Sequence, residues 1–152
     1  MKKVLIAGLM LLCGGLAMAA DTFSGPTASE RLTTARKAIE AKDWTRAKTE
    51  LEAAARDEPR NADVHNLLGY TYRKQPTPDL PKAFEHYNTA LKLNPNHRGA
   101  HEYIGVAYLM DKKPDEAEKH LVALEKICGN KTCEEYEDLA KAIAKYKAEN
   151  KS

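Results

Sequence analysis

Residues 62–97 read ADVHNLLGYTYRKQPTPDLPKAFEHYNTALKLNPNH, and residues 98–131 read RGAHEYIGVAYLMDKKPDEAEKHLVALEKICGNK. Both segments carry an aliphatic residue followed by glycine and then, three residues later, tyrosine; these are Leu68-Gly69 with Tyr72 and Ile104-Gly105 with Tyr108. Further along, Ala83 and Ala117 start a second shared pattern, and they are spaced by 34 residues. A period of this length predicts a stack of similar helical units.

The segment before residue 62 carries a weaker copy of the same pattern. Its second half contains the expected residue types, at Trp44, Ala47, Leu51, Ala54 and Pro59. Its first half departs from the pattern at Thr34 and Ala38, where leucine and tyrosine are expected. We therefore expect three units, at residues 28–61, 62–97 and 98–131.

The spacing of small, large and proline residues explains how such a unit folds. Small residues at fixed places let two antiparallel helices approach to roughly 8–10 Å. Large residues between them fill the core, and a proline near the end of each unit stops the second helix. The segment Gln75–Pro81 contains three prolines and accommodates the two extra residues of the middle unit.

These patterns resemble the tetratricopeptide-repeat family, and the resemblance covers residues 28–131. It implies an all-α fold, a right-handed solenoid of helical hairpins with three repeats. Residues 134–147 have one apolar face, acidic residues early and basic residues late, which suits the helix dipole. We expect residues 132–148 to form a capping helix and residues 149–152 a disordered tail.

The first residues predict an export signal. Lys2 and Lys3 precede the apolar run Val4–Leu16, and Ala17-Met18-Ala19 supplies a cleavage pattern. We expect a signal peptide at residues 1–19, a disordered segment at 20–27, and a periplasmic or secreted bacterial protein. The alternative is a retained anchor, although the run is shorter than the ~20 residues that a membrane-spanning helix needs.

Charge argues against a nucleic-acid partner. The chain has 24 basic and 22 acidic residues, and removal of the signal with Lys2 and Lys3 leaves 22 of each. A balanced chain has no strongly basic footprint for nucleic acid. After signal removal we expect no membrane span.

Two cysteines, Cys128 and Cys133, remain after the signal and bracket a short turn. In an oxidising compartment such a pair is expected to form a disulfide, which here would fix the angle of the capping helix. A redox or metal pair is the alternative. Thioredoxin-type redox motifs read C-x-x-C, and zinc needs four ligands while the mature chain has no second cysteine pair.

The five histidines offer a second candidate metal site. His97 and His101 are four residues apart and would share one helical face, but Arg98 stands where a zincin has glutamate. Surface or capping roles are the favoured interpretation, and His65 and His101 can simply pack between helices. No phosphate loop, nucleophile elbow or haem motif is present. We expect no enzyme activity, no cofactor and no resident metal.

The family resemblance implies a concave groove for a protein or peptide partner, lined by the first helix of each repeat. The corresponding residues are Leu32, Arg36, Ile39, Glu40, Asp63, Asn66, Tyr70, Arg73, Lys74, Glu102, Val106, Leu109 and Met110. Alternatively, Val106, Leu109 and Met110 pack against the capping helix. The family's carboxylate clamp is absent, because its places hold Leu32, Arg36, Leu67, Gly99 and Tyr103.

Repeats, an export signal and the lack of a catalytic set together favour a periplasmic adaptor or scaffold that binds other proteins. Two alternatives remain open at this point. One is a self-assembling structural protein of the envelope, and the other is metal handling through His97 and His101. Fold alone does not choose a partner.

Overall fold

The computed structural model describes residues 25–150, so the predicted signal peptide lies outside the described residues. Within this range the chain forms seven α-helices and no strand. The helices are α1 (Ala28–Glu40), α2 (Trp44–Asp57), α3 (Ala62–Lys74), α4 (Leu80–Leu93), α5 (Arg98–Met110), α6 (Pro114–Cys128) and α7 (Glu134–Glu149). None of these helices is long and apolar enough to cross a bilayer.

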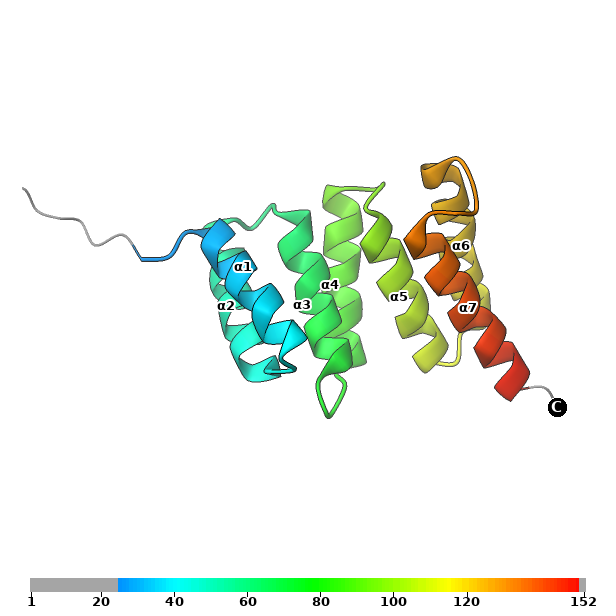
Figure 1. Cartoon of the computed structure of the whole chain (residues 1–152), viewed down its shortest axis with the longest axis horizontal. Helices are drawn as coiled ribbons and strands as arrows, with labels where there is room; N and C mark the ends of the chain where they lie inside the picture. Colours follow the sequence, from blue (N-terminus) through cyan, green and yellow to red (C-terminus); the bar gives the residue numbers. More distant parts are fainter. Residues whose placement is uncertain (1–24, 151–152) are drawn as a thin grey trace, which may run out of the picture.

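The helices form successive antiparallel hairpins, α1–α2, α3–α4 and α5–α6, arranged along the long axis of the molecule (Figure 1). Each hairpin also contacts the next, and α7 lies against both α5 and α6. The fold is therefore the predicted all-α helical solenoid.

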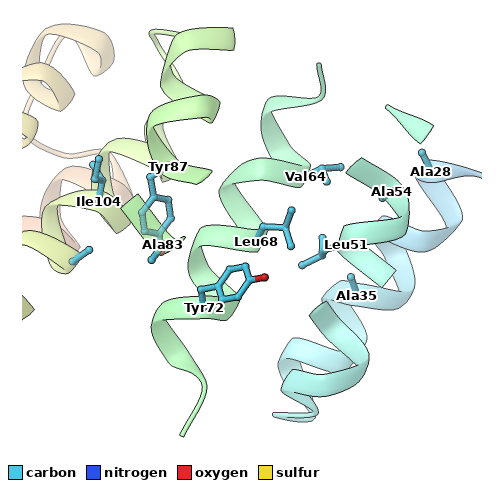
Figure 2. Close-up of a cluster of buried hydrophobic side chains, with 11 residues drawn as sticks. Ala28, Ala35, Leu51, Ala54, Val64, Leu68, Tyr72, Ala83, Tyr87 and Ile104 are labelled. Carbon is cyan, nitrogen blue, oxygen red and sulfur yellow. The ribbon is translucent and has the colours of Figure 1, made fainter. Parts of the chain in front are cut away.

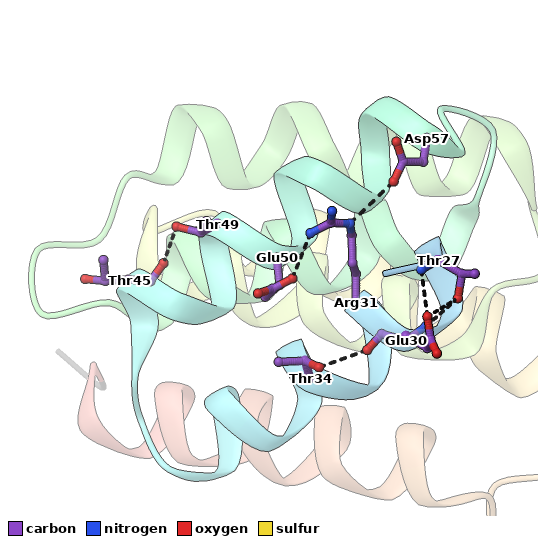
Figure 3. Close-up of polar contacts among 8 residues, drawn as sticks. All are labelled: Thr27, Glu30, Arg31, Thr34, Thr45, Thr49, Glu50 and Asp57. Atoms are coloured by element: carbon purple, nitrogen blue, oxygen red, sulfur yellow. Dashed lines mark hydrogen bonds and ion pairs between the residues drawn. The ribbon is translucent and has the colours of Figure 1, made fainter. Parts of the chain in front are cut away.

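The helix starts follow capping rules. At the start of α1, Thr27 and Glu30 form a reciprocal capping box, shown in Figure 3: the Thr27 Oγ1 accepts from the Glu30 amide, and the Thr27 amide donates to the Glu30 carboxylate. Thr27 was expected in a disordered segment, and this cap corrects that expectation. Four other helices have side-chain caps, from Asp43, Asn61, Asp79 and His97.

The turns inside the first and third hairpins use the same unusual backbone. Lys42 and Lys112 have φ angles of 57° and 58°, in the left-handed region, and both follow the first helix of a hairpin. In the middle hairpin the connection between α3 and α4 is longer and contains Pro76 and Pro78. The extra residues of the middle unit are therefore absorbed in this connection.

The larger core cluster runs from α1 to α5 (Figure 2). Its fully buried large side chains include Leu51, Leu68, Tyr87 and Ile104. A Cβ atom on Gly69 would lie 2.6 Å from the Tyr87 ring, so the absence of a side chain lets α3 and α4 meet there.

A second core cluster joins α5 and α6 to α7. Its buried residues are Leu109, Ala117, Leu124, Leu139 and Ile143. A Cβ atom on Gly105 would lie 2.7 Å from the Leu139 methyl groups, so α7 fits closely against α5. The helix α7 continues to Glu149, and the Asn150 amide donates to the Tyr146 carbonyl. The expected start of a disordered tail at residue 149 was wrong by this measure.

A disulfide between Cys128 and Cys133 connects the end of α6 to the start of α7, with an S–S distance of 2.07 Å. Between them Gly129 ends α6 with φ 70°, a left-handed conformation that glycine adopts without strain. The covalent link therefore holds the cap at the point where the chain reverses.

The first hairpin is held by ion pairs as well as by small apolar residues. Arg31 on α1 lies 3.1 Å from Glu50 and 3.4 Å from Asp57, both on α2 (Figure 3). The Arg31–Glu50 contact is a hydrogen bond, whereas the Asp57 contact is an ion pair without hydrogen-bond geometry. The pair is partly buried, which reduces its screening by solvent.

Candidate functional site

A row of half-buried aromatic rings runs from the start of α2 across α3 to α5. Trp44, just after the α1–α2 turn, lies with its ring centroid 6.5 Å from that of Tyr70 on α3. Tyr70 in turn lies 4.9 Å from Tyr103 on α5. Aromatic contacts at these separations and tilted angles are favourable beyond the area that they bury. The row crosses three helices and joins two consecutive hairpin boundaries.

Arg73 is fixed behind this row. Its guanidinium lies 5.3 Å from the Tyr70 ring centre and 5.6 Å from the Tyr103 ring centre, and its Nε–H donates to the Tyr87 hydroxyl at 3.2 Å. The side chain is 8% exposed, so the cation–π contacts form with little water around them. Burial raises the pKa of Tyr103 to about 12, which keeps this phenol protonated as a donor. Arg73 thus holds the two tyrosines and Tyr87 in one arrangement.

A pocket of about 400 Å³ lies where the first and second hairpins meet. Its lining combines aromatic and aliphatic side chains with charged ones. The lining residues are Ile39, Glu40, Lys42, Trp44, Tyr70, Lys74 and Pro76. Sites that bind ligands commonly combine apolar walls with a few polar groups in this way.

The opposite end of the row is acidic. Burial first, and then the negative charges of Asp138 and Glu135 on α7, raise the pKa of Glu102 on α5 to about 7, although Arg73 acts to lower it. Arg98 pairs with Glu135 at 3.6 Å and neutralises part of this charge. The surface therefore changes from basic and aromatic near α1–α3 to acidic near α5–α7.

The predicted groove residues do not all share one open surface. Leu109 is 7% exposed and belongs to the second core cluster, and Val106 packs against the same cluster. That cluster also contains Leu139 and Ile143 of α7. The alternative in which the capping helix covers them is therefore correct for Val106 and Leu109. Met110 remains 43% exposed. The physical reason is that α7 needs an apolar partner, and α5 supplies it.

The other predicted groove residues differ in how exposed their side chains are. Asn66 and Arg73 are buried, at 6% and 8% exposed. Leu32 and Ile39 pack against the larger core cluster. The remaining predicted residues stay at the surface or half-buried, and they are Arg36, Glu40, Asp63, Tyr70, Lys74 and Glu102.

Sequence reasoning missed Trp44 and Tyr103 as members of the site. Trp44 begins the second helix of its hairpin and so falls outside the positions that the family pattern gives to the groove. Tyr103 was considered only as a clamp position. A signal was available, because Tyr103 lies on the first helix of its hairpin, about one turn before Val106, the equivalent of Tyr70.

The alternative in which His97 and His101 form a metal pair is not supported by their contacts. His97 accepts from the Ala100 amide through Nδ1 and contacts Asp63 Oδ1 at 2.9 Å through Nε2. His101 points instead to His120. Among residues 25–150, the group of three close metal-ligand atoms is Cys128, Cys133 and Glu135, and its two cysteines are joined as a disulfide. His97 is therefore a helix cap.

Comparison with known proteins gives the same fold. The yeast Sti1 TPR2B domain in complex with pHsp70 matches with TM-score 0.71, 17% identity, 81% of this chain and 98% of that chain. The first TPR of Spaghetti (RPAP3) bound to an HSP90 peptide matches with TM-score 0.69, 17% identity, and 80% and 94% coverage. SycD, a type III secretion translocator chaperone of Yersinia enterocolitica, matches with TM-score 0.70, 13% identity, and 87% and 100% coverage.

Sequence comparison identifies the family. Among curated proteins no sequence matches the chain. The tetratricopeptide-repeat pattern matches residues 32–96 and 79–129, which together span most of the solenoid. The chain belongs to the tetratricopeptide-repeat family.

Proposed function

We propose that this protein is an adaptor that binds an extended segment of a partner protein along the aromatic row of Trp44, Tyr70 and Tyr103. The observation that carries the proposal is this row, half-buried and held by Arg73, next to the pocket at the first hairpin boundary. Rigid aromatic anchors with a central arginine are the residue types that dominate protein interfaces.

The charge along the row favours a partner segment of mixed charge. Two lysines, Lys42 and Lys74, line the pocket against one acidic residue, Glu40, whereas Glu102 has acidic neighbours on α7. A segment with acidic residues near the pocket and a basic residue near Glu102 would match both ends. Such complementarity sets orientation and specificity more than affinity.

The structural neighbours support peptide binding by this fold. The residues of this chain, however, favour a different recognition chemistry. RPAP3 and Sti1 domains were determined with an HSP90 peptide and with pHsp70. In this chain the carboxylate-clamp places hold Leu32, Arg36, Leu67, Gly99 and Tyr103. We infer that the partner is not held by its terminal carboxylate and that side-chain contacts with the aromatic row carry the binding.

We also propose that the protein works in the bacterial periplasm or is secreted. The basic, apolar and small-residue pattern of residues 1–19 supports export. The disulfide between Cys128 and Cys133 supports an oxidising compartment. Mass spectrometry of the protein from the envelope fraction tests this, with an N-terminus at Ala20 expected and a full-length chain in the cytoplasm contradicting it.

The binding proposal is tested with photo-crosslinking in cells, followed by fluorescence titration with the identified segment as a synthetic peptide. Trp44 is the single tryptophan of the chain, so its emission reports directly on the row. We expect the wild-type protein to shift emission on binding and Tyr70→Ala to weaken binding about tenfold or more, as for an aromatic anchor.

The matched control for this experiment is Val122→Ala. Val122 is 50% exposed on α6, a helix that carries none of the three rings, and its truncation also removes an exposed apolar group. Its binding should equal that of wild type. If the crosslinks map to α6, or if Tyr70→Ala binds as tightly as wild type, the row is not the binding site.

A further inference from the structure

Two pairs of histidines link the helices of the second and third hairpins. His65 on α3 faces His86 on α4 with their Nδ1 atoms 3.2 Å apart. His101 on α5 faces His120 on α6 with their Nδ1 atoms 2.9 Å apart. The members are spaced by 36 and 34 residues along the chain, as the repeats are, so the arrangement occurs twice at equivalent places.

The first histidine of each pair is oriented by a proline carbonyl. His65 Nε2 lies 3.0 Å from the Pro59 carbonyl oxygen, and His101 Nε2 lies 2.9 Å from that of Pro95. A carbonyl only accepts, so Nε2 carries the proton in each ring and Nδ1 presents a lone pair. This is the outer contact that metal-ligating histidines usually make, because it fixes the tautomer and aims the free nitrogen.

The second histidine of each pair is held by a tyrosine. The Tyr72 ring stacks on His86 at 5.5 Å with an interplanar angle of 6°, and the Tyr108 ring stacks on His120 at 5.6 Å with an angle of 19°. All four imidazoles are half-buried. Burial lowers the pKa of His86, His101 and His120, so these rings stay neutral at pH 7.

The first hairpin shows what the same place looks like without histidine. There Arg31 and Glu50 make the contact between the two helices, and Ala38 takes the place of the stacking tyrosine. A polar bridge is therefore built at this place in every hairpin. Only the second and third hairpins combine two facing Nδ1 atoms with an orienting carbonyl and a stacked ring.

We propose that the pairs His65–His86 and His101–His120 are two binding sites for a divalent transition metal that imidazole coordinates, such as Zn²⁺ or Cu²⁺. Bonds of about 2.0–2.1 Å with tetrahedral angles place two ligand nitrogens about 3.3 Å apart. The observed separations of 3.2 and 2.9 Å need only a small opening. Imidazole suits both metals.

The protons of the two rings can rearrange so that metal binding leaves both rings neutral. In the metal-free pair, His86 Nδ1–H donates to the His65 Nδ1 lone pair. When the metal takes both Nδ1 atoms, that proton moves through solvent to Nε2 of the same ring, and no proton is released while both rings are neutral. Within residues 25–150 neither pair has a third ligand atom close by, so water completes the coordination.

Calorimetry with Zn²⁺ on the tag-free, disulfide-bonded protein tests the proposal. We expect two Zn²⁺ ions per chain. The double variant His65→Arg/His86→Glu copies the bridge of the first hairpin, which keeps the helices linked but removes both ligands, and it should bind one ion. The same exchange at His101 and His120 should also leave one, and both exchanges together none.

His97→Asn is the matched control, because asparagine is an equally good helix cap and His97 lies outside both pairs. It should still bind two ions. Imidazole NMR of the wild-type protein adds a readout that needs no variant: Zn²⁺ should shift the Nδ1 signals of the four paired rings. Absence of Zn²⁺ binding in the micromolar range would overturn the proposal. It would also fail if the Nδ1 signals shift only when the pH changes and not when Zn²⁺ is added, or if the exchanged variants bind as many ions as the wild type.

Discussion

The contact between α3 and α5 and the contact between α5 and α7 use equivalent positions with opposite chemistry. At the first, Tyr70 and Arg73 of α3 meet Tyr103 of α5 through ring and cation–π contacts. At the second, the corresponding residues Val106 and Leu109 of α5 pack on the aliphatic residues of α7. The first contact leaves half-exposed rings, whereas the second is closed.

The difference indicates how a short array ends. The contact between the second and third hairpins lies in the interior of the array, next to the larger core cluster, so a buried arginine and polar rings are tolerated there. The last hairpin has a neighbour on one side only, and its outer face needs a purely apolar seal with a polar exterior. The helix α7 provides that seal through Leu139 and Ile143, and its outward residues are charged.

Removing the seal should have the largest effect. Leu139 is fully buried, so Leu139→Ala is expected to lower the free energy of unfolding by about 2–5 kcal/mol. Chemical denaturation gives the magnitude. Hydrogen exchange should show that α7 loses protection first while α3 and α4 keep theirs, because each repeat contacts only its neighbours. Equal loss of protection in all helices would show that the two contacts are not independent.

The disulfide should contribute the next largest effect. Its loop is short, so the chain-entropy relation gives about 2 kcal/mol at most. Dithiothreitol should lower the unfolding free energy of the wild-type protein by up to that amount and should leave the double variant Cys128→Ser/Cys133→Ser unchanged. If reduction lowers protection in α1–α4 as strongly as in α7, the link does more than hold the cap.

The two glycines at equivalent places distinguish the contacts directly. Gly69→Ala puts a methyl group against the Tyr87 ring, which is fully buried and held by Arg73, so the ring has little room to move. We expect a net loss of about 1–2 kcal/mol, since overpacking costs about 1–3 and better helix propensity returns part of it. Chemical denaturation measures it.

Gly105→Ala should cost less than Gly69→Ala. Its new methyl group meets the ends of the Leu139 side chain rather than an aromatic ring, and methyl groups can move by a small rotation. A larger loss for Gly105→Ala would mean that the contact of α5 with α7 is the more rigid of the two.

Much of the fold was predictable from the sequence because it depends on local patterns. Gly69, Tyr72, Ala83 and their copies in the next repeat set the helix spacing, and each unit contacts only its neighbours. The site was less predictable. Position in the repeat singled out Tyr70 and Arg73, which lie in and behind the aromatic row, but the same rule assigned the buried Leu109 to an open groove. What covers a position depends on the next helix, and α7 does not follow the repeat pattern.

The last effect should come from Glu102, and it should depend on pH. Its folded pKa of about 7 lies above the ordinary value of 4.5, so the folded state holds this proton more tightly than the unfolded state. Stability from this group is therefore complete below about pH 4.5 and is lost as pH rises through 7. Glu102→Gln should raise the melting temperature at pH 8 and have little effect at pH 4.5.

The position of Glu102 makes the same measurement informative about the two contacts. Burial is the largest cause of its raised pKa, and the acidic residues of α7 come next, so opening of the cap should lower this pKa toward its ordinary value. Carboxyl NMR on Leu139→Ala should show that decrease, and on Gly69→Ala it should not. An unchanged pKa in Leu139→Ala would mean that α3 and α5 alone shield the carboxylate, because its surroundings would then not depend on whether α7 is in place.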